Sequence, residues 1–140
     1  MDENWNLSGK VMSALVTVHR ALGPCLLEEA YESCFAEELR HRSVPFERQV
    51  PIPVRYRSIE VSRAYVADLV VDRRVIVELK AVEKISSLHM AQTLTYLRLA
   101  GLQTALLVNF HVLEIRRGIR RLSLRTVRAN TARGDVAANP

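Results

Sequence analysis

The sequence lacks a hydrophobic segment long enough to cross a membrane. Its longest apolar stretches, such as residues 105–108, are strand-sized, whereas a transmembrane helix needs about 20 apolar residues. The first residues, Met1 to Asn4, are acidic and polar, which argues against a secretory signal peptide. Only two cysteines occur, Cys25 and Cys34, and their spacing suits neither a disulfide scaffold nor a zinc site. We therefore expect a cytoplasmic, reduced protein in which both cysteines are small buried hydrophobic residues.

The sequence also lacks the short motifs of several enzyme classes. It contains none of the patterns G-x-x-x-x-G-K-[S/T], G-x-S-x-G, H-E-x-x-H or C-x-x-C, and its five glycines are not clustered. These absences argue against a phosphate-cradling glycine loop, a nucleophile elbow and a zinc-protease helix. Length and composition are those of one ordinary globular domain, with 140 residues, 49% hydrophobic and 25% charged. We expect this domain over residues 1–125 and a flexible tail over 126–140.

Arginine is abundant and unevenly distributed. Twenty basic residues against fifteen acidic residues give a net charge of +5, and seventeen of the twenty are arginine. Residues 111–140 hold seven arginines and only two acids. A basic stripe is typical of nucleic-acid binding, although a solvated basic surface has the same composition. The candidates for contacts to phosphate in this region are Arg116, Arg117, Arg120 and Arg121.

Capping residues and hydrophobic periodicity predict three helices. Ser8 is expected to cap the first helix, which ends at Gly23-Pro24. The second is predicted over about residues 26–40, and the third begins at Ser86 or Ser87 and ends at Gly101. The inward-facing candidates of the second helix include Leu27, Tyr31, Cys34 and Leu39.

The remaining apolar segments predict strands. Residues 45–56 contain three prolines, which favours an edge strand or an irregular arm. Further strands are predicted at 65–71, 75–80 and 104–110, the last buried on both faces, followed by a hairpin over 113–124. The element order ααβββαβββ describes a small single α/β domain, with a mixed β-sheet flanked by helices.

Residues 68–80 carry the most informative pattern. With residues 72–74 as a loop, Asp68 lies opposite Glu78, and strand alternation brings Lys80 to the same side. Two facing carboxylates in an apolar hairpin repel each other, unless one is protonated or a cation lies between them. Such oxygen ligands suit Mg²⁺ or Mn²⁺, with Lys80 holding a water or a phosphate oxygen. A structural ion pair on a solvent-facing strand would use the same residues.

Four stretches in register resemble the GxxExxY family of the PD-(D/E)XK nuclease superfamily. They span residues 18–31, 75–82, 89–98 and 107–110. Glu28 and Tyr31 match the naming motif, whereas Cys25 replaces its first glycine. The resemblance implies a restriction-endonuclease-like core and a metal-dependent nuclease. It would hydrolyse nucleic-acid phosphodiester bonds, preferentially in DNA, with a water activated by Mg²⁺ or Mn²⁺.

The resemblance also implies roles for individual residues. Asp68, Glu78 and the backbone carbonyl of Leu79 would bind the metal, and Glu28 would be a further metal or water ligand. Lys80 would orient or activate the water and stabilise the developing charge. Without the resemblance, Glu28 would be read as one of several charges on a solvated helix face.

Three residues of the third helix complete the candidate site. Gln92 and Tyr96, four residues apart and so on one helical face, match a Q-x-x-x-Y signature seen in relatives of recombination-associated exonucleases. They would position Lys80, the water or the nucleic-acid backbone. Gln92 could also be a surface amide and Tyr96 an ordinary core residue. His89, in the first turn, would contact phosphate or cap the helix.

Two other functions stay open at this point. One is a nucleic-acid-binding or regulatory protein that keeps the nuclease fold without cutting. The other is a metal-dependent phosphoesterase acting on a nucleotide or another small phosphate, against which the basic residues argue. The presence of every expected catalytic side chain favours catalysis. Many relatives act as pairs, so the resemblance suggests a homodimer, and no membrane partner is expected.

Overall fold

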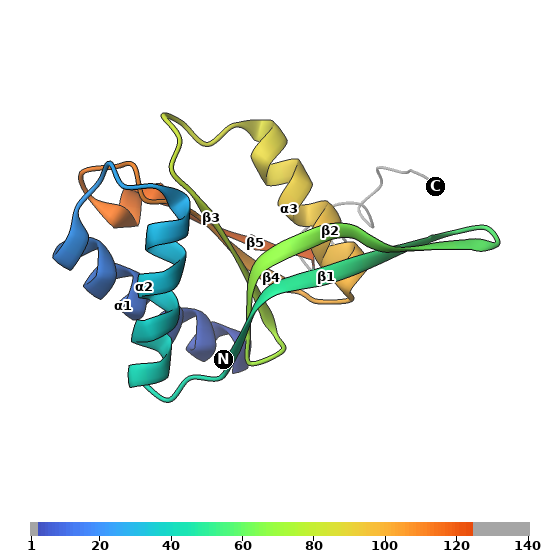
Figure 1. The fold of residues 1–140 in the computed structure, drawn as a ribbon, viewed down its shortest axis with the longest axis horizontal. Coiled ribbons are helices and arrows are strands. Elements are labelled where there is room, and N and C mark those ends of the chain that lie inside the picture. The colour runs from blue at the N-terminus through green and yellow to red at the C-terminus, as the bar shows by residue number, and fades with distance from the viewer. Residues whose placement is uncertain (1–2, 125–140) are drawn as a thin grey trace.

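A mixed five-stranded sheet organises the chain, with helices on both of its faces (Figure 1). The computed structural model describes residues 3–124. Helices α1 (Glu3–Leu22) and α2 (Glu28–His41) cover one face, and α3 (Ser87–Ala100) covers the other. A 3₁₀ turn, η1 (Ile115–Gly118), precedes the last strand. In the order in which they lie in the sheet, the strands are β1 (Phe46–Tyr56), β2 (Ile59–Val71), β3 (Val75–Lys80), β4 (Thr104–Asn109) and β5 (Ile119–Ser123).

The two central strands pair in parallel, and the other pairs are antiparallel. β3 and β4 run in the same direction because α3 carries the chain back across the sheet. Helices on both sides bury these strands, so that almost every residue of β3 and β4 is inaccessible to solvent. Val77 and Leu79 pack toward α1 and α2, whereas Ile76 and Ala105 pack toward α3. The predicted α/β domain with a mixed sheet is therefore confirmed.

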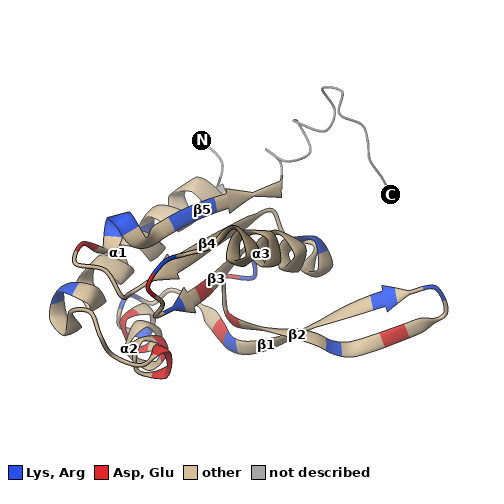
Figure 2. Cartoon of the chain, turned by 90° about the horizontal axis from the view of Figure 1, so that it is seen from above, with Lys and Arg blue, Asp and Glu red and all other residues tan. Residues whose placement is uncertain are grey.

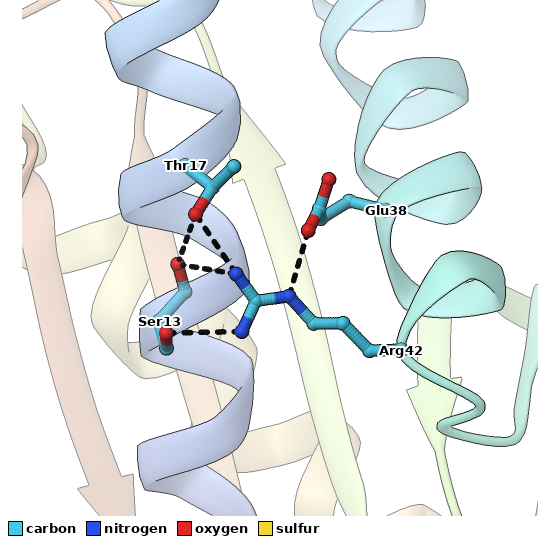
Figure 3. Close-up of polar contacts among 4 residues, drawn as sticks. All are labelled: Ser13, Thr17, Glu38 and Arg42. Atoms are coloured by element: carbon cyan, nitrogen blue, oxygen red, sulfur yellow. Dashed lines mark hydrogen bonds and ion pairs between the residues drawn. The ribbon is translucent and has the colours of Figure 1, made fainter.

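One arginine ties the two helices of the first layer together (Figure 3). The Arg42 Nε donates to Glu38 Oε2 at 2.7 Å at the end of α2. Its two terminal nitrogens donate across to α1, to Ser13 Oγ at 3.0 Å and Thr17 Oγ1 at 2.8 Å. The fork of the guanidinium thus binds both helices at once, which fixes how α2 lies against α1.

Several predicted elements are confirmed. β1 is an edge strand, β3 spans the predicted residues, and residues 72–74 form the loop between β2 and β3. Ser86 caps α3 through its side chain, and Gly101 ends the helix in the left-handed conformation, with φ of 71°. Within the described residues, no helix is both long and apolar enough to cross a bilayer.

The prediction that Ser8 caps the first helix is wrong. α1 begins at Glu3, and Ser8 lies inside it, where its Oγ accepts a hydrogen bond from Arg121 Nε at 3.4 Å. The serine side chain therefore bonds an arginine of the distant strand β5 and not the backbone at the start of its own helix. This contact between residues far apart in the sequence cannot be read from local capping rules.

Two inward-facing predictions on α2 are also wrong. Tyr31 and Leu39 are buried as expected, but Leu27 is 80% exposed and Cys34 is exposed. The buried stripe runs through residues 31, 32, 35, 36 and 39, so position 34 falls outside it and position 27 precedes the helix. Cys25 is exposed as well, which contradicts the expected burial of both cysteines.

The predicted hairpin over residues 113–124 is wrong. The segment forms η1 followed by the single strand β5, because Ile115 and Gly118 are buried and draw the chain into a turn. The described order is therefore ααβββαββ, one strand shorter than expected. β2 in turn begins at Ile59 rather than at residue 65. The expected tail over 126–140 lies outside the described residues.

The buried Asn109 holds the chain just after β3. Its Oδ1 accepts from the backbone N–H of Val82 and of His111, each at 3.1 Å, and its Nδ2 donates to the Val82 carbonyl at 2.8 Å. The Phe110 N–H donates to the Lys80 carbonyl at 2.9 Å. The end of β4 therefore fixes the backbone at and beyond Lys80.

Gly118 packs directly against this clamp, and we predict that Gly118→Ala destabilises the protein. A Cβ at this position would collide with the backbone carbonyl oxygen of Asn109. We expect the free energy of unfolding to fall by about 1–3 kcal/mol, measured by chemical denaturation. The control is Gly9→Ala on α1, where an added Cβ meets nothing within 4 Å and should stabilise by about 0.5–1 kcal/mol. Equal stability of Gly118→Ala and the wild type would contradict the packing described.

Candidate active site

Asp68 and Glu78 lie side by side on β2 and β3, as the sequence predicts. The observed register pairs Leu69 with Val77 and Val71 with Val75. The regular pairing ends at Leu69 and Val77, and at the next residues the two carboxylates accept hydrogen bonds from backbone N–H groups. The Leu79 N–H donates to Asp68 Oδ2 at 2.8 Å, and the Asp68 N–H donates to Glu78 Oε1 at 3.4 Å.

Lys80 ends β3 on the same side as these carboxylates. Strand alternation gives Glu78 and Lys80 one face and Leu79 the other, where Leu79 joins the core under α1 and α2. Lys80 is half-buried, and among the described residues it has no ion-pair partner. Its ammonium group is therefore available to an anion brought to this face.

Tyr65 belongs to the site and was missed by the sequence reasoning. Its hydroxyl donates to Glu78 Oε2 at 2.5 Å, and its ring stacks on Tyr96 of α3 with the planes 9° apart. Strict alternation along β2 would place residues 65 and 68 on opposite faces of the strand. The alternation is interrupted between them, since Ala67 and Val70 both pack toward α3, and the Tyr65 hydroxyl and the Asp68 backbone N–H both reach Glu78.

The interruption lies at a kink in the hairpin of β1 and β2. The register pairs Arg48 with Leu69 and Val50 with Ala67, so Gln49 lies opposite Asp68, and its backbone adopts a left-handed conformation with φ of 51°. The buried carboxylate of Glu32 on α2 holds this kink, accepting from Gln49 Nε2 at 2.9 Å and from Arg48 Nε at 3.0 Å. The sequence signal for this kink is Glu32 on the buried side of α2. A buried charge needs polar partners, and these come from β1.

The site keeps Glu78 protonated near neutral pH. Burial, with the neighbouring Asp68 charge, raises the pKa of Glu78 to about 8, although the Tyr65 hydroxyl acts in the opposite direction. Burial and the charge of Glu78 also raise the pKa values of Tyr65 and Tyr96, so both hydroxyls stay protonated. This is the consequence expected of two carboxylates forced together in an apolar setting.

Glu28 does not join the pair of carboxylates. It is exposed in the first turn of α2, and no three His, Cys, Asp or Glu side chains in the described part of the chain are placed to hold one metal ion. Its helix is anchored nearby by Tyr31, which stacks on Phe110 with ring centroids 4.2 Å apart and donates to the Gly23 carbonyl.

The three predicted residues of α3 occupy different positions. Tyr96 contacts the site through Tyr65, and Gln92 lies one turn earlier, half-buried. His89 forms a capping box with Ser86: its Nδ1 accepts from the Ser86 N–H at 3.0 Å, and its own N–H donates to Ser86 Oγ at 3.1 Å. One ring nitrogen of His89 is thus used for capping.

The four predicted arginines do not share one surface. Arg120 pairs with Leu107, which pairs with Glu78, so these three residues form one row across the sheet and point to the same face. Arg121 points to the other face, where its guanidinium lies 5.0 Å from the Trp5 ring centroid. Arg116 and Arg117 are exposed in η1.

We predict that Glu78→Gln removes part of the pH dependence of the stability. Because the folded-state pKa of Glu78 lies above its ordinary value, its contribution is fully present below pH 4.5 and is lost as pH rises through about 8. A glutamine cannot ionise, so the Tm of the variant relative to the wild type should rise between about pH 5 and pH 8, by roughly a few degrees, and level off above that. Thermal unfolding in EDTA measures this.

The matched control is Glu83→Gln at an exposed position of the loop after β3. Its Tm should follow the wild type at each pH. Parallel curves for Glu78→Gln and the wild type would show that Glu78 is not held neutral in the folded state.

Comparison with known proteins supports the nuclease resemblance at the level of the superfamily. A protein-family profile described as the PD-(D/E)XK nuclease superfamily matches residues 5–122, a range that includes both carboxylates and Lys80. Neither the curated proteins nor the solved structures include a significant match. The matched range spans the described sheet and all three helices, and the chain belongs to the PD-(D/E)XK nuclease superfamily.

Proposed function

We propose that the protein is a metal-dependent nuclease that hydrolyses phosphodiester bonds in DNA. The observation that carries this proposal is that Asp68 and Glu78 meet on the face that Lys80 shares: the Asp68 N–H donates to Glu78 Oε1, and the Asp68 carboxylate accepts from the Leu79 N–H. Two carboxylates and one amine are the groups that a hydrolytic site needs for a cation and for the phosphate oxygens. The net charge of +5 supports a polyanionic substrate.

The donor set fits a hard divalent cation. Burial, and after it the neighbouring Asp68 charge, raise the pKa of Glu78, and a bound cation would offset the second of these causes. Asp68, Glu78 and the Leu79 carbonyl would hold Mg²⁺ or Mn²⁺, the kind of cofactor typical of the superfamily. Such an ion would lower the pKa of a nearby water and neutralise charge on the phosphate.

The protein's own groups then have separate tasks. Glu78 must lose its proton before it can bind a cation, and the Tyr65 hydroxyl stabilises the resulting carboxylate by hydrogen bonding. The Lys80 ammonium would bind a phosphate oxygen and stabilise the charge that develops there. Asn109 serves this geometry indirectly, since it holds the backbone just beyond Lys80.

Glu28, Gln92 and Tyr96 are proposed to complete the site around the substrate. Support for Glu28 comes from Tyr31, three residues later, which stacks on Phe110 at the end of β4, beside the Lys80 backbone. Gln92 and Tyr96 share one face of α3, and Tyr96 already contacts Tyr65. We propose that these side chains position the backbone of the bound strand.

Within the superfamily we propose the GxxExxY family. Cys25 occupies the position of the first glycine of the naming motif, and its backbone has φ of 80°. This is a conformation that glycine adopts without strain. The local geometry therefore fits a glycine motif even though the residue itself has changed.

A non-catalytic nucleic-acid-binding role is the second candidate. It is favoured by the closure of the site in this structure, where Glu78 is only 2% exposed and Tyr65 covers one of its oxygens. A site that stayed closed on substrate binding would hold nucleic acid without cutting it.

A cleavage assay separates the two candidates. We expect Mg²⁺- or Mn²⁺-dependent cleavage within a panel of single-stranded, duplex, flapped and junction DNAs. Lys80→Met and Asp68→Asn should each lower the rate by at least about 100-fold, because the first removes charge stabilisation at the phosphate and the second removes a ligand of the cation. Lys10→Met on the exposed side of α1 is the control and should cleave normally. Cleavage that survives both site substitutions would refute the proposed site.

We further predict that Arg120 contributes to DNA binding and that Arg121 does not. Arg120 lies in the row of Glu78, whereas Arg121 stacks on Trp5 behind the sheet. Arg120→Gln should weaken binding in EDTA at all sequences alike and lower the salt slope by about 1. Fluorescence anisotropy measures both values, with Arg121→Gln as the matched variant. If both substitutions weakened binding equally, DNA would not bind preferentially on the face of the sheet that carries Glu78.

A further inference from the structure

The hairpin of β1 and β2 projects beyond the rest of the protein (Figure 1). β2 pairs with β3 only from Leu69 to Val71, so most of β2 has β1 as its sole neighbour among the described strands. We call residues 53–64 the arm. Every arm residue from 55 to 64 is exposed, which leaves both faces of this two-stranded ribbon open to solvent.

The arm carries excess positive charge (Figure 2). It contains Arg55, Arg57 and Arg63 against the single acid Glu60. Arg55 and Glu60 form an ion pair at 3.2 Å, and because both side chains are exposed, this pair contributes little to stability. Within the described chain, no carboxylate pairs with Arg57 or Arg63. These two guanidinium groups are free to meet phosphates.

One face of the arm is apolar. Cross-strand partners point to the same side, and the register pairs Val54 with Val61 and Tyr56 with Ile59. Tyr56 is 64% exposed and Ile59 is 58% exposed, far more than such side chains usually are. The Arg57 guanidinium lies 5.5 Å from the Tyr56 ring centroid at the tip. An aromatic ring beside cations is the composition that contacts bases and phosphates together.

The base of the arm touches the candidate active site. Tyr65, the first residue of β2 after the arm, donates its hydroxyl to Glu78. From Tyr65 to the tip at Ser58 the ribbon extends about 23 Å, at roughly 3.3 Å per residue. A duplex held at Glu78 and running parallel to the arm would therefore pass along it for about seven base pairs.

We propose that the arm grips duplex DNA beside the phosphate bound at the active site. Arg57 and Arg63 would contact phosphates, and Tyr56 with Ile59 would contact the bases in a groove. A two-stranded ribbon fits the major groove, which is about 12 Å wide. This inference rests on the proposed nuclease function, from which the substrate class is taken.

A second copy of the chain is a less suitable occupant of the arm. In a two-fold symmetric contact, each arm would meet the same surface of its partner. If that surface is the other arm, the arginines of the two arms face one another and repel, whereas the phosphates of DNA attract them. The charge of the arm therefore favours a polyanion.

Binding to DNA without metal tests the arm separately from cleavage. The arm variant carries Arg55→Gln, Arg57→Gln and Arg63→Gln. Its affinity for a fluorescein-labelled 24-base-pair duplex is measured by anisotropy in EDTA over a series of KCl concentrations. We expect the affinity to fall at least about tenfold and the salt slope to decrease by about 2 to 3. A second variant, Tyr56→Ser with Ile59→Ser, should weaken binding without changing that slope.

The control removes the same charge elsewhere, through Arg20→Gln on α1, Arg40→Gln on α2 and Arg73→Gln in the loop after β2, all exposed positions outside the arm. It should bind within about threefold of the wild type, because these residues lie off the proposed DNA path. Arm and control variants that lose affinity equally would overturn the inference, since only total charge would then matter.

Further outcomes separate this inference from the proposed function. Normal binding by the arm variant, together with metal-dependent cleavage that Lys80→Met abolishes, would refute the arm and leave the nuclease intact. A wild-type chain that neither binds nor cleaves DNA would refute both. Light scattering completes the test, because a dimer that the Tyr56→Ser and Ile59→Ser variant converts to monomer would make the arm an oligomer contact and overturn the proposal.

Discussion

Repulsion between two carboxylates is the constraint around which this protein is arranged. Asp68 and Glu78 are brought together by a hairpin whose other members are apolar, and the fold compensates by keeping Glu78 protonated and hydrogen-bonded to Tyr65. An apolar pair at these positions would serve the core better. The chain nevertheless has two acids here and supports them from three neighbouring elements. This arrangement favours a functional centre over a purely structural one.

The supports of the site come from both layers of the structure. α2 reaches it through Glu32, which holds the kink beside Asp68, and α3 reaches it through Tyr96, which stacks on Tyr65. β4 contributes Asn109, which fixes the chain after Lys80. A short site on two strands thus depends on contacts that span most of the chain, and the family match over residues 5–122 covers all of them.

The parts that sequence reasoning predicted are those set by local rules. The register that brings Asp68 to Glu78 follows from a three-residue loop and strand alternation, and the ends of α3 follow from Ser86 and Gly101. Tyr65 escaped prediction because the kink at Gln49 interrupts that alternation. Arg121 illustrates a further limit, since its partner Trp5 lies at the other end of the chain, where no pattern of neighbours could point to it.

The strand order has a consequence for how the chain assembles. Strands follow one another in the sheet as they do in the sequence, so hairpins form from near neighbours and only the β3–β4 joint waits for a helical crossover. α1 is different, because Asn4 bonds Thr104 and Ser8 bonds Arg121, across separations of 100 and 113 residues. Helix α1 therefore completes these contacts only after β5 has emerged from the ribosome.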